Sequence, residues 1–168
     1  MSKGLFIIGI FSSWLLFFSS CKKEATGIDQ ELYTMASSSS GFTWFKLTGV
    51  SLPKSSGSGH NYPFLRTRYN PIASTSLDSI GMVLPNSKFK EGSFIVKELQ
   101  NSSGSLERYA ILYKDSGNEY ADAEGWVWGY INSDGTVAET AEKKGTSCIG
   151  CHQQSGNIDY GLMNKFFP

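Results

Sequence analysis

The sequence predicts a mainly β (α+β) fold, in which a small antiparallel meander carries a few short helices. Three observations predict it. Short stretches of alternating apolar and polar residues recur, turn-forming residues separate them, and 168 residues suit one compact domain with an address segment. Aromatic residues make up 14% of the chain, so large side chains are available to fill one core.

The clearest strands are expected at residues 94–99, 109–114 and 126–131, where side-chain character alternates. Residues 65–70 are a further candidate, and residues 42–47 fit a strand or a short helix equally well. Asn, Asp, Ser and Gly cluster in the gaps, as is typical of turns between antiparallel neighbours. These turns are at residues 101–104, 115–117 and 132–135, and short helices are expected at residues 146–154 and 159–166.

The first twenty residues are typical of an export signal. Lys3 precedes a mostly apolar run at residues 5–18, which is short for a bilayer span, and small residues lead to Cys21. The pattern resembles the lipobox of bacterial lipoproteins, in which a lipid is attached to the cysteine after the leader is removed. We therefore expect residues 1–20 to be a signal peptide and Cys21 to be the lipidated N-terminus.

The remainder divides by composition into residues 21–40 and residues 41–168. The first part is polar and ends in four serines, which predicts a lipid-anchored tether, and the second is the expected folded domain. Over the whole chain, 15 basic side chains balance 15 acidic ones. This charge balance indicates neither nucleic acid nor an anionic membrane surface as a partner, so the membrane is reached through the lipid alone.

The segment Cys148-Ile149-Gly150-Cys151-His152 carries the chemistry. Two cysteines on one helical turn face the same way, so each sulfur can form a thioether with one haem vinyl group, and His152 follows as the iron ligand. A zinc site would need a fourth ligand, and His60 is the one further histidine. A redox Cys-x-x-Cys pair would want a βαβ context. The motif therefore predicts one covalent haem c.

The sixth iron ligand separates electron transfer from small-molecule chemistry. Met82, Met163 and His60 are the candidates, although methionines usually fill cores and His60 follows a Ser/Gly-rich stretch typical of a loop. Lys97 shares one face of its predicted strand with Ile95 and Leu99. It is either an amine directed into an apolar space or an edge lysine that reaches water.

Together these residues resemble the cytochrome P-460 family and its relatives, the cytochromes c-prime-beta. The resemblance rests on residues 66–71 (RTRYNP), residues 92–99 (GSFIVKEL), Trp126, Trp128, residues 147–152 (SCIGCH) and residues 159–160 (DY). It implies a mainly antiparallel fold with one haem, an open distal side and a homodimer.

The resemblance also implies roles for single residues. In hydroxylamine-oxidising members a lysine matching Lys97 is crosslinked to the haem edge, and a distal arginine matches Arg66 or, one residue on in register, Arg68. Those members use a distal carboxylate as proton acceptor, which the matching strand near Ala110 lacks; Glu107 is the nearest acid. Lys97 and Arg66 are the predicted catalytic residues, with the missing carboxylate favouring ligand binding over turnover.

Three functions stay open at this point. The chain is expected to oxidise hydroxylamine or a related compound, to bind nitric oxide at an open haem, or to act as a six-coordinate electron-transfer cytochrome with a redox partner protein. The predicted location is the periplasmic side of a bacterial membrane, with inner and outer membrane left open.

Overall fold

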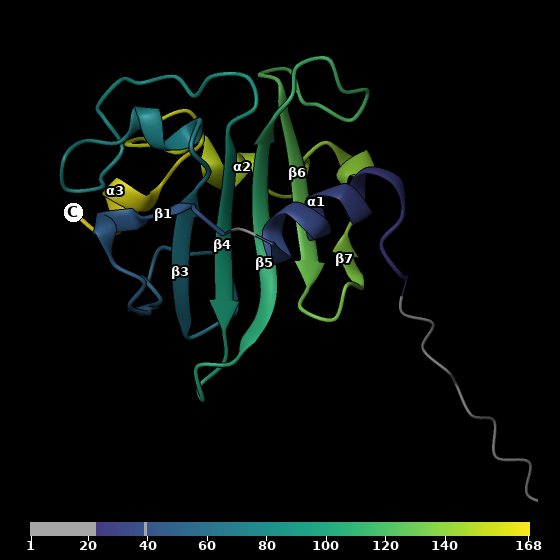
Figure 1. Cartoon of the computed structure of the whole chain (residues 1–168), viewed down its shortest axis with the longest axis horizontal. Coiled ribbons are helices and arrows are strands. Elements are labelled where there is room, and N and C mark those ends of the chain that lie inside the picture. Colours follow the sequence, from purple (N-terminus) through teal and green to yellow (C-terminus); the bar gives the residue numbers. More distant parts are fainter. Residues whose placement is uncertain (1–22, 39) are drawn as a thin grey trace, which may run out of the picture.

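One antiparallel sheet organises the chain in a computed structural model that describes residues 23–38 and 40–168. Its strand order is β1-β3-β4-β5-β6-β7 (Figure 1), and β2 pairs with β3 off this path. The strands are β1 (Thr43–Trp44), β2 (Leu52–Pro53), β3 (Phe64–Tyr69), β4 (Phe94–Gln100), β5 (Leu106–Lys114), β6 (Trp126–Asn132) and β7 (Val137–Glu139). The predicted antiparallel meander is therefore confirmed in β4, β5 and β6.

The helices are short, as expected, except for one. They are α1 (Gly27–Ser37), η1 (Phe45–Leu47), η2 (Ala73–Ser76), η3 (Ala141–Lys143), α2 (Ile149–His152) and α3 (Met163–Phe166). The segment that fitted a strand or a helix equally well is both, since β1 runs directly into η1. No helix within residues 23–38 and 40–168 is long and apolar enough to cross a bilayer.

The turns form where their chemistry predicted. Between β4 and β5, the Asn101 side-chain oxygen accepts the backbone N–H groups of Ser103 and Ser105, and Gly104 takes a φ of 81° that favours glycine. Between β6 and β7, Asn132 N–H donates to the Thr136 carbonyl. These local hydrogen bonds fix the strand register.

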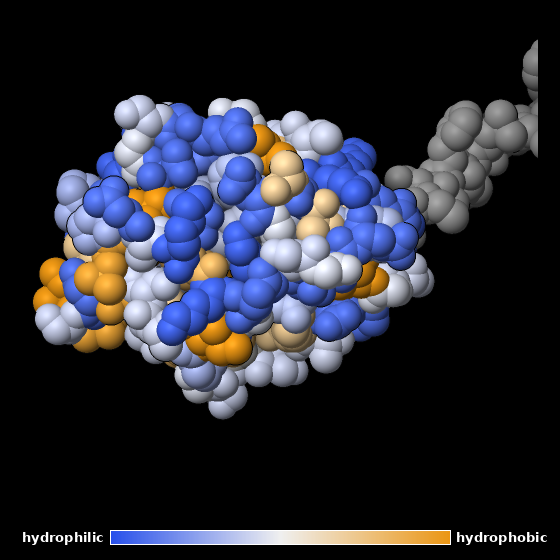
Figure 2. All heavy atoms as spheres, turned by 90° about the horizontal axis from the view of Figure 1, so that it is seen from above, coloured by the Kyte–Doolittle hydropathy of each residue, from blue (hydrophilic) through white to orange (hydrophobic). Residues whose placement is uncertain are grey.

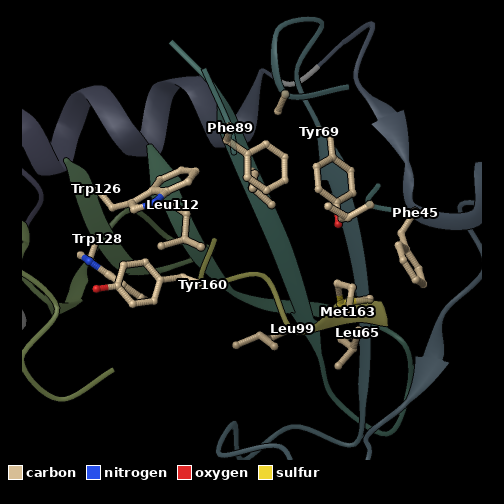
Figure 3. Packing of buried hydrophobic residues seen from close by; sticks show 13 residues of the cluster. Phe45, Leu65, Tyr69, Phe89, Leu99, Leu112, Trp126, Trp128, Tyr160 and Met163 are labelled. Atoms are coloured by element: carbon tan, nitrogen blue, oxygen red, sulfur yellow. The ribbon is translucent and has the colours of Figure 1, made fainter. Parts of the chain in front are cut away.

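Each face of the sheet carries its own apolar cluster because side chains alternate along every strand. One cluster packs under α1 and includes Leu32, Phe94, Val96 and Ile131. The other lies toward α2 and α3 and includes Leu65, Leu99, Trp126, Trp128 and Met163 (Figure 3). Figure 2 shows that hydrophilic side chains cover most of the face seen from above, with apolar residues in separate groups.

The prediction of a tether at residues 21–40 is wrong for its described part. Residues 27–37 form α1, which lies across β5 and β6 in Figure 1. Leu32 and Ala36 are fully buried, and the buried Asp29 carboxylate accepts hydrogen bonds from Thr140 Oγ1 (2.7 Å) and Ala141 N–H (2.9 Å). The segment is polar because only one stripe of the helix faces the sheet. The folded domain thus begins well before residue 41.

The predicted signal peptide and the lipid attachment site at Cys21 lie outside the described residues.

Candidate haem site

A cavity of about 240 Å³ lies between the sheet and the C-terminal segment that carries α2 and α3. One side of the cavity is lined by side chains from β3, β4, β5 and β6, and the C-terminal segment lines the opposite side. Most of the lining is apolar or aromatic, which suits a flat hydrophobic cofactor. The polar or ionisable lining residues on which the site depends are His60, Lys97, Tyr130, Cys148, Cys151 and His152.

The haem-binding motif lies at this cavity because a tight turn delivers it there. Gly145 precedes the turn with φ 67°, and a Cβ at this position would be 2.6 Å from the Trp128 ring, so only glycine lets the chain pass the tryptophan. The Gly145 carbonyl then accepts the N–H groups of Cys148 and Ile149. Both Cys148 and Cys151 are free thiols that line the cavity, and burial raises the pKa of Cys148.

His152 is oriented for metal binding by one hydrogen bond. Its Nδ1 lies 2.7 Å from the backbone carbonyl oxygen of Tyr160, and because a carbonyl only accepts, Nδ1 carries the hydrogen. Nε2 therefore keeps its lone pair, which is the form that binds iron. Burial, together with the positive charge of Lys97, lowers the His152 pKa to about 4, so the ring is neutral. The Trp128 ring meets the imidazole edge to face at a centroid distance of 5.1 Å.

The turn that supplies this carbonyl is strained and is held by a buried carboxylate. Asp159 and Tyr160 have φ values of 46° and 67°, in the left-handed region. The Asp159 side chain, 2% exposed, accepts the N–H of Phe89 at 2.8 Å and the indole N–H of Trp126 at 3.4 Å. Asn157 accepts the Tyr160 N–H at 3.2 Å. The His152 partner is thereby anchored to the core.

Asp159→Ala is expected to lower the free energy of unfolding by about 2 kcal/mol, because a buried N–H loses its acceptor. Asp159→Asn should lose less, since asparagine tolerates a positive φ and keeps one acceptor. Lys88→Ala is the matched control: this partner of Asp159 is 74% exposed, at 3.6 Å, and its removal should cost under about 0.5 kcal/mol. Urea unfolding of the intact protein measures all three. Equal losses for Asp159→Ala and Lys88→Ala would contradict the role of the buried bonds.

Lys97 lies on the cavity side of β4, as its alternation with Ile95 and Leu99 indicated. It pairs with Thr67 on β3 and Ala110 on β5, so it is on a central strand rather than an edge. Burial in this apolar surrounding lowers the pKa of its amine to about 8, opposed in part by the Cys151 thiol. A much larger neutral fraction at physiological pH makes the amine a better nucleophile than a surface lysine.

The expectation of a distal arginine at Arg66 or Arg68 is not met by the structure. Alternation along β3 sends Leu65, Thr67 and Tyr69 toward the cavity cluster and both arginines to the other face. There both guanidinium groups pair with the buried carboxylate of Glu98. Their Cζ atoms lie 4.8 and 5.0 Å from the Trp44 ring, a cation–π arrangement. The family resemblance aligned the motif but did not say to which face of the sheet its arginines point. The alternation of the strand, which follows from the apolar Leu65 and Tyr69, decides that face.

Of the two acids Glu107 and Glu139, only Glu139 lines the cavity. Glu107, the acid nearest to Ala110 in sequence, is outside the cavity lining and accepts a hydrogen bond from the Asn101 side chain at 2.6 Å. Among the described residues that line the cavity, Glu139 is the one carboxylate, and the Ser147 hydroxyl donates to it. A cavity so poor in acids has little to accept a proton from a bound molecule.

The three candidate sixth ligands are also separated by the structure. Met82 packs against the core cluster but is not part of the cavity lining. Met163 lines the cavity, and its sulfur accepts a hydrogen bond from the Thr67 hydroxyl at 3.2 Å. His60 lines the cavity too, with Nδ1 3.4 Å from the hydroxyl of Tyr130. The sequence fits a loop histidine or a sixth ligand at this position, and it contains no signal for the pairing of His60 with Tyr130, 70 residues away.

Within residues 23–38 and 40–168, no group of three His, Cys, Asp or Glu side chains converges in the manner of a metal-ion site. The donor set instead fits haem: two thiols, one imidazole with a free nitrogen, and an apolar cavity beside them.

Comparison with known proteins agrees with this donor set. A family model described as Cytochrome P460 matches residues 69–161, which is more than half of the chain and runs from the end of β3 through the haem-binding motif. His60, Arg66 and Arg68 precede the matched segment. The searches of curated proteins and of solved structures gave no match. The chain belongs to the cytochrome P460 family and is a haem protein.

Proposed function

We propose that this chain is an exported protein with one haem c, bound covalently by Cys148 and Cys151, which binds small nitrogen compounds such as nitric oxide or hydroxylamine. The observation that carries the proposal is that both thiols and the metal-binding nitrogen of His152 belong to one apolar cavity. When bound there, haem supplies an iron that can take a small ligand and exchange electrons. The chain itself fixes the proximal imidazole and surrounds it with mostly apolar and aromatic side chains.

Ligand binding is favoured over turnover by the polar groups of the cavity. Oxidising hydroxylamine requires proton acceptors as well as an electron acceptor. The carboxylate among the described lining residues, Glu139, is already engaged by Ser147. The aromatic wall of Trp128 and Tyr160, whose rings lie 5.3 Å apart, adds no base.

Electron transfer is the alternative, and it needs a second strong ligand to iron. Met82 is outside the cavity lining, and the sulfur of Met163 is directed to Thr67. These contacts disfavour a methionine as the sixth ligand, so His60 is the remaining candidate ligand for an electron-transfer cytochrome.

A hydroxylamine-type oxidoreductase is the second candidate, and Lys97 favours it. The amine lies in the cavity and its pKa is lowered, as a lysine that attaches to the haem edge requires. Arg66, predicted as a second catalytic residue, is on the other face of the sheet and has no part in this proposal.

The setting of the protein is also proposed. The leader at residues 1–20 and the lipid at Cys21 would hold the domain on the periplasmic side of a bacterial membrane. Covalent haem attachment in bacteria takes place outside the cytoplasmic membrane, which supports export. The family resemblance implies a homodimer, and an iron that exchanges electrons would need a redox partner protein.

Absorption spectra of the mature holoprotein test the proposal, recorded for the wild type, Lys97→Ala and the exposed-lysine control Lys54→Ala. We expect high-spin ferric and ferrous spectra that are alike in all three, as for an unmodified open haem. A broadened, red-shifted ferrous Soret band that reverts only in Lys97→Ala would instead support the oxidoreductase. A six-coordinate low-spin spectrum would support electron transfer, and absence of covalent haem would overturn the proposal.

A further inference from the structure

His60 reaches the cavity from an ordered loop that follows β2. The loop is closed by a hydrogen bond from Lys54 N–H to the Pro63 carbonyl (2.8 Å). It packs against α3 so closely that a Cβ at Gly57 would lie 2.6 Å from the Phe166 ring. His60 is half-buried, and its imidazole is tilted 30° from the Tyr130 ring at a centroid distance of 5.7 Å. The histidine is therefore held in the cavity wall by packing on both sides.

Tyr130 lies between two neighbours, His60 and Arg108. The Arg108 guanidinium carbon lies 4.5 Å from the Tyr130 ring centroid, and Arg108 is itself fixed by a 2.7 Å hydrogen bond to the Asn132 side chain. Hydrogen bonding and charge from Arg108 partly offset the burial that raises the Tyr130 pKa. A guanidinium carries donors only, so Arg108 offers the phenol hydrogen no acceptor, whereas Nδ1 of His60 at 3.4 Å can accept it.

This arrangement selects one tautomer of His60. With the phenol as donor, Nδ1 at 3.4 Å is the acceptor, and in a neutral imidazole the hydrogen is then on Nε2. The ring is neutral because burial and the nearby positive charges, Lys97 first among them, lower the pKa of His60 to about 3. Among the described residues, Nε2 has no hydrogen-bond partner.

We propose that His60 is the hydrogen-bond donor that the cavity offers to a small ligand through a lone-pair atom, such as the oxygen of nitric oxide, and that Tyr130 and Arg108 are positioning residues that set its tautomer. The inference rests on the proposed function and deepens it. It makes the polar group of the cavity a donor, which holds a bound acceptor and does not remove a proton from it. The site thereby selects ligands with an exposed lone pair.

The test is nitric oxide binding to the ferrous holoprotein, with dissociation rates measured for the wild type, His60→Leu, His60→Gln and Tyr130→Phe. His60→Leu should speed dissociation about 2- to 10-fold, the range that one net hydrogen bond supports. His60→Gln keeps an N–H donor and should recover most of the difference. Tyr130→Phe removes the hydroxyl that fixes the hydrogen of His60 on Nε2, so both neutral tautomers become populated and the dissociation rate should be intermediate. Tyr33→Phe, whose hydroxyl bonds to Ser133 beyond the cavity, should leave the rate unchanged.

A second measurement does not depend on dissociation. Carbon monoxide bound to the ferrous protein should show a higher C–O stretching frequency in His60→Leu than in the wild type, because a donor near the oxygen is lost. Equal rates and frequencies in both proteins would overturn the donor role while leaving nitrogen-ligand binding intact. A wild-type ferric spectrum that changes from low to high spin in His60→Leu would make His60 an iron ligand and would also overturn it. No nitric oxide binding by any variant would remove both proposals.

Discussion

Replacing Cys148 and Cys151 together by alanine is expected to abolish covalent haem, so that a haem stain of a denaturing gel falls from a full signal to none. Both thiols are free and line the cavity, and they are the cysteines on the turn that carries His152. Thioether formation at two vinyl groups needs both sulfurs. The loss should be complete, since under the proposed function the two thioethers are the covalent links to haem, and non-covalent contacts do not survive denaturation.

Cys21→Ala is the matched control, because it removes the third cysteine and keeps both cysteines that line the cavity. It should keep the full haem stain and lose the lipid, which is measured as release of the protein from the membrane fraction. A haem signal that survives in the double variant would contradict the assigned attachment, and a signal lost in Cys21→Ala would show that haem attachment depends on anchoring.

Leu32→Ala is expected to lower the free energy of unfolding by about 3 kcal/mol, within the range for large-to-small changes in a core. Leu32 has no exposed surface, and it packs from α1 into the cluster that includes Phe94, Val96 and Ile131. Its Cδ1 lies 2.9 Å from where a Cβ at Gly129 would be, so α1 approaches the sheet as closely as glycine allows. Urea unfolding of the holoprotein, with the haem intact, measures the loss.

Glu31→Ala, the neighbouring exposed position on α1, serves as its control and should change stability by less than about 0.5 kcal/mol. If Leu32→Ala were as mild as this control, α1 would be a dispensable addition to the sheet. If Leu32→Ala lowers the free energy of unfolding several times more than Glu31→Ala does, α1 is part of the folded domain.

The sheet was predictable because each strand has a clear local pattern in the sequence. Apolar and polar side chains alternate clearly in residues 94–99 and 126–131, and turns that contain Asn and Gly follow them. The alternation and the turn residues therefore indicate the same strands. The helix α1 was missed for the opposite reason. Its buried stripe consists of Leu32 and Ala36 with a buried acid, Asp29, and so little apolar surface does not stand out from a polar linker.

The candidate site divides in the same way. Cys148, Cys151 and His152 lie within five consecutive residues, so their proximity needs no knowledge of the fold. The period of one strand put Lys97 on the same face as Ile95 and Leu99, but the choice between cavity and water depends on the neighbours that make β4 a central strand. Arg66 was misplaced because its side depends on a phase that the motif alone does not state. The pairing of His60 with Tyr130 joins a loop to a strand 70 residues away, and only the folded chain brings them together.

The chain enters the sheet almost as soon as the described residues begin. The Lys23 carbonyl accepts the Val137 N–H at 2.7 Å, and Ala25 N–H donates to Gly135 at 3.1 Å. A lipid on Cys21 would then be at most about 7 Å of extended chain from a residue already fixed beside β7. A lipid at that position would hold the β6–β7 hairpin directly beside the bilayer surface, and the domain would have little freedom to move away from the membrane.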